Sequence, residues 1–328
     1  MPKNNRFSEK PLLVHITTVP ITLAFLSGQV SFMKSRGLRI HAISSPGSLL
    51  EKFSAQEKIQ VHPVKMSRKI TPFDDLQALF RILCLLRKLK PKIVHSHTPK
   101  AGLLGMIAAR LLNVPVRIYH IHGFPFMTSK GMKRSLLISS EKLSCKFSNQ
   151  VFCVSRSIRE FAISKRICQA KKIKTLLNGS INGVDAIGAF DPSKLDLVHK
   201  QKIRKSLGIP MEAIVVGFVG RLVKDKGIEE LFCAWKALKD GIHNLRLLLI
   251  GPFEPNDPLK KDTMISLHRD SRIHLVGFVQ KEELPSYYSA MDFFVLPSYR
   301  EGFPVTPLEA GAMELPVVGT NIPGCVDA

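Results

Sequence analysis

Short apolar blocks alternate with longer amphipathic segments along the whole chain. In the first half the blocks are rich in Leu, Val and Ile, as in strands that are buried on both faces of a sheet. The segments between them place apolar residues three or four positions apart, which is the spacing of helices that cover a core. The predicted strands span 11–19, 38–45, 92–97, 114–123, 150–155 and 173–179, and the clearest helices span 23–37, 74–90 and 100–113.

A second series of strands and helices follows a polar, charged stretch at 191–210. Alternation of strands and helices indicates parallel sheets, so the sequence predicts an α/β protein of two Rossmann-like domains, 1–190 and 191–328, with a cleft between them. In open sheets of this kind ligands lie beyond the carboxyl ends of the strands. The predicted strands of the second series span 213–220, 245–251, 273–278, 292–298 and 315–320, with helices at 227–241 and 281–292.

The net charge is strongly positive and is confined to the first half. The 328 residues contain 48 Lys and Arg against 26 Asp and Glu. Residues 1–190 hold 31 basic and 8 acidic side chains, whereas residues 191–328 hold 17 and 18. A basic domain favours a polyanionic partner, either an anionic membrane surface or a nucleic acid. The alternative is an ordinary solvated basic face.

The composition also excludes some classes of protein. With 45% hydrophobic residues the chain is not disordered, and its apolar runs are far shorter than the ~20 residues that span a bilayer. Its six cysteines are scattered and form no Cys-x-x-Cys pair. This pattern predicts buried free thiols in a reducing compartment, and neither a disulfide framework nor a zinc site made of cysteines.

The most informative segment is the loop that follows the predicted strand 292–298. It contains Glu301 and Gly302, and Glu309 follows in a helix that begins near Thr306. Glycine lets the backbone approach a ligand closely, and ionised carboxylates accept hydrogen bonds from sugar hydroxyls. The alternative is structural, with Glu301 capping the helix and Glu309 on the surface.

A second loop is basic and follows the first strand of the second series. The strand ends at Gly220 and Arg221, and Lys224 and Lys226 lie just before the next helix. A guanidinium fork and an ammonium group suit the oxygens of a diphosphate. The loop is neither a Walker A motif nor a Gly-x-Gly-x-x-Gly motif, so it is weak evidence by itself.

Together the two loops resemble the retaining GT-B glycosyltransferases of family 4. The resemblance rests on Gly-Arg-Leu at 220–222, on Lys-Gly at 226–227, and on Glu301-x7-Glu309 within Pro-Ser…Glu-Gly-Phe-Pro…Leu-Glu-Ala. It covers essentially the whole chain, and the combination is far more specific than any one piece. The implied fold is GT-B, with the acceptor on the first domain and the nucleotide sugar on the second.

The first half resembles one branch of this family in particular. Residues 16–37 and 94–126 are similar to the enzymes that build capsule, O-antigen and related bacterial surface polysaccharides on a polyprenyl-diphosphate carrier. The resemblance implies transfer of a hexose or N-acetylhexosamine to such a lipid-linked glycan. It also implies retention of configuration, by a same-face mechanism in which the departing phosphate helps to deprotonate the acceptor.

The resemblance assigns roles to the basic loop and to the base-binding strand end. The donor is expected to be UDP-linked. Gly220, Arg221 and Lys226 would neutralise its diphosphate and stabilise the leaving group without a metal or other cofactor. No Asp-x-Asp motif occurs in the sequence, in agreement with metal independence. The backbone near Phe278 and Val279 would contact the base.

The same resemblance assigns the sugar contacts to the carboxylate loop. Glu301, together with the backbone of Gly302 and Phe303, would hold the hydroxyls of the transferred sugar. Glu309 would accept hydrogen bonds from the ribose hydroxyls. Glu301 and His122 are the candidate catalytic residues, and no separate nucleophile is expected.

Histidines dominate the candidate residues of the first domain. His122 ends a predicted strand where many family members place a histidine near the reacting sugar, and its expected role is hydrogen bonding and positioning. His120 lies deeper on the same face and is the second candidate, and a purely structural histidine is the alternative. His97, Thr98 and Lys100 precede a helix N-terminus that suits the carrier diphosphate of the acceptor, although they would also suit a plain helix cap.

The chain departs from the family in two places. Residues 17–20 read Thr-Thr-Val-Pro where many members have a Gly-Gly pair, which leaves that acceptor contact unassigned. The sequence stops at Ala328, where family members continue for roughly one more strand and several helices. The expectation is a C-terminally truncated protein, and an inactive or split fragment is an alternative to the active enzyme.

The basic segments 81–92 and 124–147 predict the location of the protein. Each is able to form an amphipathic helix with a Lys/Arg rim, which lies in the interface of an anionic membrane. The sequence therefore predicts a cytoplasmic protein that is peripheral on the inner face of the cytoplasmic membrane. Two further alternatives are a GT-B sugar epimerase and a basic nucleic-acid-binding protein. Only four Tyr and one Trp are present and no nucleic-acid-binding signature occurs, so no specific nucleic acid is expected.

Overall fold

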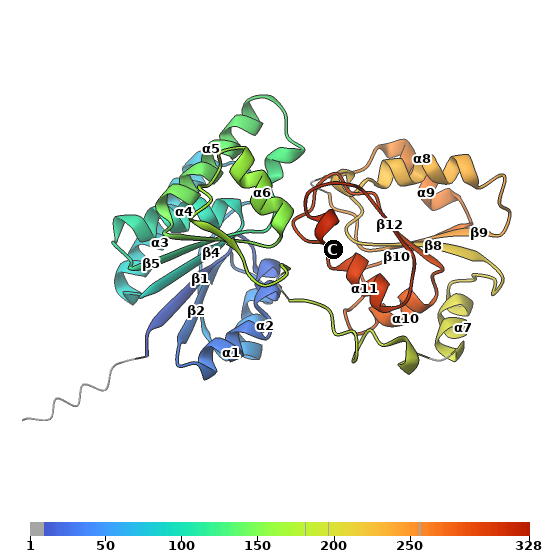
Figure 1. Cartoon of the computed structure of the whole chain (residues 1–328), viewed down its shortest axis with the longest axis horizontal. Coiled ribbons are helices and arrows are strands. Elements are labelled where there is room, and N and C mark those ends of the chain that lie inside the picture. Colours follow the sequence, from blue (N-terminus) through green and yellow to red (C-terminus); the bar gives the residue numbers. More distant parts are fainter. Residues whose placement is uncertain (1–9, 181, 196, 256) are drawn as a thin grey trace, which may run out of the picture. The chain divides into compact units, whose positions relative to one another are not determined.

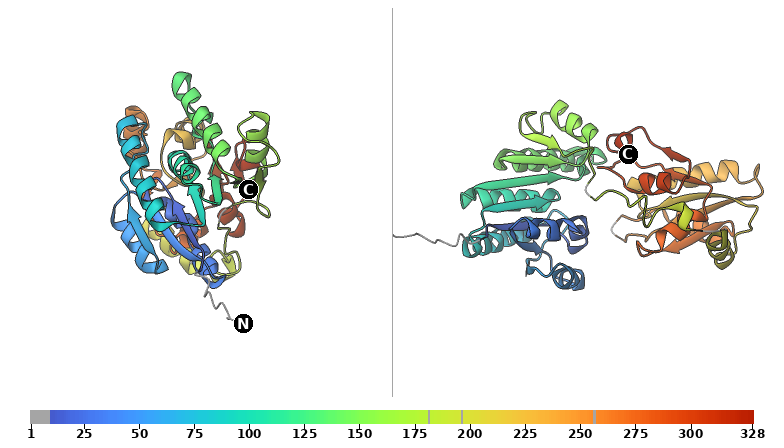
Figure 2. Two further views of the ribbon diagram at one scale, coloured as in Figure 1. Left: turned by 90° about the vertical axis from the view of Figure 1, so that its left-hand side faces the viewer. Right: turned by 60° about the horizontal axis from the view of Figure 1, so that its bottom comes forward.

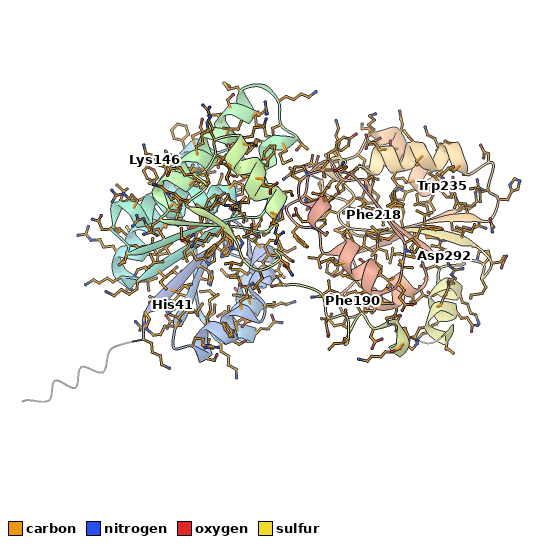
Figure 3. The ribbon with its side chains drawn as sticks, in the orientation of Figure 1. His41, Lys146, Phe190, Phe218, Trp235 and Asp292 are labelled. Atoms are coloured by element: carbon orange, nitrogen blue, oxygen red, sulfur yellow. The ribbon has the colours of Figure 1, made fainter. Side chains whose placement is uncertain are left out.

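The protein is built from two compact units, Met1–Asn182 (unit 1) and Gly183–Ala328 (unit 2), shown in Figure 1 and Figure 2. The structure is a computed structural model that describes residues 10–180, 182–195, 197–255 and 257–328. The boundary lies a few residues before the predicted one at 190/191. The reason is that Phe190 is buried in the core of unit 2 (Figure 3).

Unit 1 contains a seven-stranded parallel sheet in the order β3-β2-β1-β4-β5-β6-β7. The chain runs outward in one direction from β1 and then returns to the other side of it with β4, so the order reverses between β1 and β4. The strands are β1 Leu12–Ile16, β2 Arg39–Ser44, β3 Gln60–Pro63, β4 Ile93–His97, β5 Val116–Ile121, β6 Gln150–Cys153 and β7 Ile173–Thr175.

Helices cover both faces of this sheet and enclose two apolar cores (Figure 1). One core lies against α3, α4, α5 and α6, and the other lies against η1, α1 and α2. The α-helices are α1 Gln29–Ser35, α2 Ser48–Glu57, α3 Pro72–Leu89, α4 Pro99–Leu111, α5 Gly131–Phe147 and α6 Arg156–Ser164, and the 3-10 helices are η1 Pro20–Leu26 and η2 Pro125–Met127.

Two parts of unit 1 differ from the sequence prediction. The predicted helix 23–37 is broken at Gly28, whose φ of +76° is a left-handed conformation that a continuing α-helix cannot contain. Strand β3 had no predicted counterpart. It is a four-residue edge strand with partly exposed side chains, so it has no apolar block that a pattern would reveal.

Helix α4 packs unusually close to the sheet because glycines face it. A Cβ on Gly102 would lie 2.2 Å from the Tyr119 ring, and one on Gly105 would lie 2.2 Å from the Ser96 hydroxyl oxygen. The Tyr119 hydroxyl in turn donates to the buried carboxyl of Glu141 in α5 at 2.7 Å. This packing fixes the start of α4 against the end of β4.

The buried carboxyl of Glu141 is expected to make unit 1 less stable as the pH rises. Burial raises its pKa from the ordinary 4.5 to about 7, although the hydrogen bond from Tyr119 acts in the opposite direction. Between these two values the folded protein holds a proton that the unfolded chain has released, so the free energy of unfolding falls across that window. The loss between pH 5 and pH 8 should be about 2–3 kcal/mol.

Urea unfolding of the wild type and of Glu141→Gln at pH 5 and pH 8 measures this loss. The glutamine accepts the same hydrogen bond from Tyr119 but does not titrate, so the variant should lack this part of the pH dependence. Equal pH dependence in the two proteins would contradict the assignment. Other titrating groups cancel in the comparison because both proteins contain them.

Unit 2 contains a five-stranded parallel sheet in the order β10-β9-β8-β11-β12. Here the order reverses between β8 and β11. The strands are β8 Ile214–Val219, β9 Leu245–Ile250, β10 Ile273–Gly277, β11 Phe293–Leu296 and β12 Val317–Gly319. The helices are η3 Pro192–Lys194, α7 Leu197–Ser206, η4 Lys224–Lys226, α8 Ile228–Leu238, α9 Lys261–Arg269, α10 Leu284–Ser289, α11 Thr306–Ala312 and η5 Cys325–Asp327.

The polar stretch 191–210 is part of this unit, because it contains α7 and one buried arginine. The side chain of Arg204 is 1% exposed and its Nη2 lies 2.8 Å from Oδ2 of Asp292. Its Nη1 donates to the carbonyl oxygens of Met211 and Ala213 at 2.7 and 2.9 Å. A buried charge with this many partners cannot be read from apolar periodicity, which marks such a stretch as exposed.

The cysteines are free, as predicted, but they are not all buried. Cys145, Cys153 and Cys168 are buried, whereas Cys84 and Cys233 are exposed. Within the described residues, none of the helices combines the length and the apolar character that a membrane span needs.

Candidate functional site

The candidate site of unit 2 lies at the carboxyl ends of β8 and β11, where the strand order reverses. In open parallel sheets the loops on either side of such a point separate and leave room for a ligand. The loop after β8 is the basic one, with Lys224 and Lys226 in η4. The loop after β11 carries the carboxylate of Glu301. Although far apart in the sequence, the two loops follow neighbouring strands.

An ion pair joins the two loops directly. Nζ of Lys226 lies 2.5 Å from Oε1 of Glu301, and the two side chains are 19% and 9% exposed. The residue predicted to bind the diphosphate, Lys226, is therefore in direct contact with the residue predicted to bind the sugar, Glu301. Glu301 is not a helix cap, since α11 begins without a side-chain cap. The alternative that Glu301 caps this helix is thus wrong.

Further contacts hold the two loops together. Nη2 of Arg300 lies 2.5 Å from Oδ2 of Asp225, and the backbone N–H of Tyr299 donates to the Asp225 carbonyl oxygen at 2.9 Å. Gly227 has a φ of +71°, and a Cβ there would lie 2.0 Å from the carbonyl oxygen of Pro297. Only glycine allows this approach, so the spacing of the loops depends on it.

The loop after β12 closes another side of the carboxylate loop. The Thr320 hydroxyl donates to the Ser298 carbonyl oxygen at 2.6 Å. A Cβ on Gly324 would lie 2.7 Å from the carbonyl oxygen of Gly302. Gly302 is buried and Phe303 is partly exposed. The backbone that was predicted to contact the sugar is therefore held from both sides.

Glu309 is buried, so the alternative that places it on the surface is wrong. It is 6% exposed, and the Tyr288 hydroxyl of α10 donates to its Oε2 at 2.9 Å. Burial raises the pKa of this carboxyl, while the hydrogen bond from Tyr288 and the charge of Lys281 act in the opposite direction. Tyr288 therefore orients Glu309, and sequence reasoning missed it because it lies on a different helix.

The other predicted donor residues lie at the same sheet edge but are not gathered around one point. Nη1 of Arg221 pairs with Oε2 of Glu254 at 2.8 Å, and the N–H of Gly220 donates to the Ile250 carbonyl oxygen at 2.9 Å. Phe278, after β10, is 68% exposed, whereas Val279 packs against the core. Glu254 was not predicted, since its loop has no recognisable motif.

In unit 1 the loops after β1 and β4 meet through two threonines. The hydroxyls of Thr18 and Thr98 lie 2.8 Å apart, and the Ala101 N–H at the start of α4 donates to the Thr18 hydroxyl at 3.2 Å. Thr98 has a φ of +71°, which is strained for a β-branched residue and is typical of functional loops. Lys100 turns away and pairs with Asp75 at 2.5 Å. The three predicted acceptor residues thus face three different partners.

Five histidines form one cluster on β1, β4 and the end of β5. In the sheet register His15 lies opposite His95, and His97 lies opposite His120. Because side chains alternate between faces, residues two apart share a face, and His122 joins the same side. We call His15, His95, His97, His120 and His122 the histidine cluster. Sequence reasoning found the last three and missed His15 and His95, although the His-x-His spacing on neighbouring strands was a usable signal.

Hydrogen bonds and ring contacts connect the cluster. Nδ1 of His15 lies 3.0 Å from Nε2 of His97, and Nδ1 of His97 lies 3.2 Å from Nε2 of His122. Burial lowers the pKa of every member, to about 3 for His15 and about 4 for His120, and the neighbouring imidazoles lower most of them further. The cluster is therefore neutral at pH 7. His122 is the partly exposed end of the cluster, and the Phe25 ring stacks on it with a centroid distance of 5.1 Å.

Both halves of the chain match known protein families. Residues 13–155 match the family described as Glycosyl transferase 4-like, and residues 199–328 match the Glycosyl transferases group 1. The first match contains the histidine cluster, and the second contains Lys226, Glu301 and Glu309.

Curated relatives match most of the chain. The Capsular polysaccharide biosynthesis glycosyltransferase CapM of Staphylococcus aureus is 34% identical over 316 residues, which are 96% of this chain and 80% of CapM. The UDP-Gal:alpha-D-GlcNAc-diphosphoundecaprenol alpha-1,3-galactosyltransferase of Escherichia coli is 33% identical over 79% of this chain and 65% of its own length. The N,N'-diacetylbacillosaminyl-diphospho-undecaprenol alpha-1,3-N-acetylgalactosaminyltransferase of Campylobacter jejuni is 28% identical over 79% and 66%.

Solved structures share the fold at lower identity. The Anabaena Alr3699/HepE structure in complex with UDP and glucose has a TM-score of 0.74 and 18% identity, over 97% of this chain and 82% of that one. WaaG, a glycosyltransferase involved in lipopolysaccharide biosynthesis, has a TM-score of 0.71 and 13% identity, over 95% and 82%. With two α/β units, parallel sheets and these matches, the chain belongs to the group 1 glycosyltransferases of the GT-B fold.

Proposed function

We propose that the chain transfers a hexose or N-acetylhexosamine from a UDP-linked nucleotide sugar to a polyprenyl-diphosphate-linked glycan, with retention of configuration. The observation that carries the proposal is the contact between Lys226 and Glu301 at the strand-order reversal of unit 2. It puts a cation for a diphosphate beside a carboxylate for sugar hydroxyls. The acceptor class is supported by the E. coli and C. jejuni relatives, whose names specify diphosphoundecaprenol-linked sugars.

In the proposed reaction the bond between the anomeric carbon and the donor phosphate oxygen breaks. A bond to the acceptor hydroxyl oxygen forms on the same face, and the acceptor proton moves to the departing phosphate. Lys226 and Arg221 stabilise the charge that develops on the diphosphate, so no metal is required at this site. Glu301 and the Gly302–Phe303 backbone orient the sugar.

Glu309 is proposed to bind the nucleotide through its ribose. Tyr288 holds Oε2, and the other oxygen accepts hydrogen bonds from the ribose hydroxyls. Phe278 and Val279 offer backbone groups to the base. In unit 1, His122 positions the reacting groups, and His97, Thr98 and Lys100 lie around the α4 start that we assign to the acceptor diphosphate. Lys100 reaches it only by leaving Asp75.

A thermal-shift experiment with UDP, GDP and ADP tests the donor site. UDP at about 100 times its Kd should stabilise the protein by about 2.7 kcal/mol, which raises the melting temperature by several degrees. Glu309→Gln keeps the acceptor for Tyr288 but weakens binding of ribose hydroxyls, so it should lose most of the shift. Glu282→Ala, at an exposed position before α10, is the control. If no nucleotide shifts the folded protein, or if Glu309→Gln shifts like wild type, the donor assignment is wrong.

An anionic membrane surface is proposed as a further partner of unit 1, on the face formed by α3 and α5. On α3, Phe73, Leu76 and Phe80 are 89%, 67% and 67% exposed at a spacing that places them on one side. On α5, Met132 and Leu136 are 80% and 51% exposed. Both helices flank α4 on one face of the sheet (Figure 1). Exposed basic side chains accompany them: Arg81, Arg87, Lys88, Lys130, Lys133, Arg134, Lys142 and Lys146.

Co-sedimentation with vesicles tests this surface. The protein should bind phosphatidylglycerol vesicles at low salt and dissociate from them at high salt. It should bind phosphatidylcholine vesicles only weakly. The double variant Phe73→Ser with Phe80→Ser should lower the vesicle-bound fraction several-fold, because it removes apolar side chains that would be buried in the membrane. Phe32→Ser, which changes an exposed phenylalanine of α1 on the other side of the sheet, should not. Equal loss in both variants would contradict the proposed face.

A further inference from the structure

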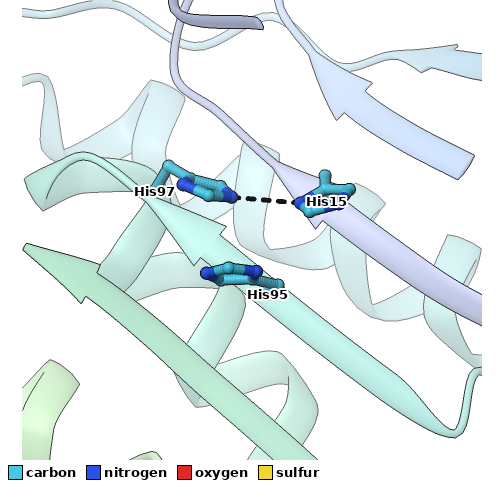
Figure 4. Close-up of side chains that lie close together, drawn as sticks. All are labelled: His15, His95 and His97. Atoms are coloured by element: carbon cyan, nitrogen blue, oxygen red, sulfur yellow. Dashed lines mark hydrogen bonds between the residues drawn. The ribbon is translucent and has the colours of Figure 1, made fainter. Parts of the chain in front are cut away.

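The histidine cluster contains a set of nitrogens that suits a metal ion. His15 comes from β1, and His95 and His97 come from β4. Figure 4 shows the three rings close together, with a hydrogen bond between His15 and His97. Each offers one ring nitrogen, and these nitrogens lie within 4.8 Å of one another. The centroids of His95 and His97 are 4.1 Å apart. The sheet register therefore brings three imidazoles close enough to be candidate ligands of one ion.

The distances agree with a coordination site. Two nitrogens bound tetrahedrally to one ion at about 2.05 Å are about 3.3 Å from each other. Nδ1 of His15 and Nε2 of His97 lie 3.0 Å apart, close to such an edge. The same distance also describes a hydrogen bond between imidazoles, so a second observation has to distinguish the two.

That observation is a buried nitrogen without a hydrogen-bond partner. Among the described residues, Nε2 of His95 is buried and makes no hydrogen bond, and the residue is 7% exposed. Nε2 of His15 is also buried without a partner among these residues, but it is the other nitrogen of the ring whose Nδ1 lies near His97, so only one of the two can bind the ion. A buried polar nitrogen with no partner is costly, and a metal ion is one group that such a lone pair satisfies.

The ligand type points the same way, because the imidazole nitrogen of histidine is a common metal ligand. Three neutral nitrogens favour borderline ions such as Zn²⁺, Co²⁺ or Ni²⁺ over Mg²⁺ and Ca²⁺, which prefer oxygen ligands. Three protein ligands also leave a fourth position for water or an anion, which would balance part of the charge.

We infer that His15, His95 and His97 form a binding site for one borderline divalent transition-metal ion, with Zn²⁺ as its representative. The site is inside unit 1 and is separate from the donor residues of unit 2, so it does not depend on the proposed transfer reaction. A second triad, His97, His120 and His122, shares His97 and is the competing arrangement.

Equilibrium dialysis of the untagged, metal-free full chain with Zn²⁺ tests the site. We expect about one ion per chain, and no comparable binding of Mg²⁺. His15→Gln should lower the affinity for Zn²⁺ by more than about 100-fold. A change in a residue that only supports the ligands would lower it by about 10- to 100-fold. His122→Gln should leave it within about tenfold, because His122 belongs only to the second triad.

Two controls keep the result interpretable. His41 and His62 form an isolated pair at 3.1 Å on β2 and β3, so His41→Gln should leave Zn²⁺ binding unchanged. Co²⁺ added to the wild type should give the visible absorption of a tetrahedral nitrogen site, a readout that does not depend on whether a variant folds. Failure of the wild type to bind Zn²⁺ stoichiometrically would overturn the inference. Greater loss in His122→Gln than in His15→Gln would also overturn it.

Discussion

Replacing Lys226 with methionine is expected to lower kcat for sugar transfer by about 100-fold or more. The ammonium group is proposed to stabilise charge that appears on the diphosphate as the sugar leaves, so its loss affects the transition state more than the bound donor. Donor KM should change much less than kcat. Steady-state kinetics with the UDP-linked donor, on protein shown to be folded, measures both.

Lys224→Met is the matched control for this prediction. Lys224 lies in the same 3-10 turn, η4, and carries the same charge, but its side chain is exposed. A general effect of positive charge on donor attraction would lower kcat/KM similarly in both variants. A specific role of Lys226 requires that only Lys226→Met loses kcat. Equal losses, or none, would contradict the role.

The contact with Glu301 adds a stability test to the kinetic one. Removing Lys226 leaves a carboxylate that is 9% exposed without its cation, at a cost of about 1–3 kcal/mol. Glu301→Gln in the Lys226→Met background should recover part of this stability while activity stays low. Recovery of activity together with stability would mean that Lys226 acts only through folding.

Gly227→Ala is expected to destabilise unit 2 by about 3–5 kcal/mol. The left-handed backbone conformation at φ +71° costs an alanine about 1–2 kcal/mol. The remainder comes from the added methyl group, which would lie 2.0 Å from the carbonyl oxygen of Pro297. That oxygen belongs to the backbone after β11, so it cannot move without shifting the carboxylate loop.

Gly277→Ala separates the two contributions. Gly277 has a φ of +78°, and a Cβ there meets nothing within 4 Å, so this variant should lose only about 1–2 kcal/mol. Urea unfolding followed by fluorescence of Trp235 reports on the correct unit. Trp235 is the single tryptophan, and it is buried (Figure 3). It lies on α8, the helix that begins directly after Gly227. Equal destabilisation of the two variants would show that the close approach to Pro297 is not maintained in solution.

Most elements of the fold follow from local pattern, and the exceptions have physical causes. The apolar blocks predicted β8 and β11 because strands buried on both faces of a parallel sheet are rich in apolar residues. The pattern failed at Gly28, where a left-handed residue interrupts apolar spacing that is otherwise helical. It also failed at α7, a largely exposed helix whose buried contact is made by Arg204, so that its sequence looks like a polar connection.

The same division holds for the candidate site. The charged residues after the strands, taken together with the resemblance to family 4, singled out Lys226, Glu301 and Glu309. Sequence reasoning did not predict Tyr288, Asp225 or Glu254, whose roles depend on partners from other elements. Lys100 was singled out by its position before a helix N-terminus, but its ion pair with Asp75 at the start of α3 is a long-range contact that the position does not reveal.

By itself the sequence determined the order of strands and helices, the basic character of the first half, and the loops that carry charged side chains. Only the tertiary structure decided which loops meet. The strands that matter, β1 with β4 and β8 with β11, are neighbours in the sheets but are separated in the chain by other strands. Their pairing and register result from packing across whole sheets, which no local pattern contains. For this reason the Lys226–Glu301 pair and the union of His15 with His95 and His97 became visible only in the folded protein.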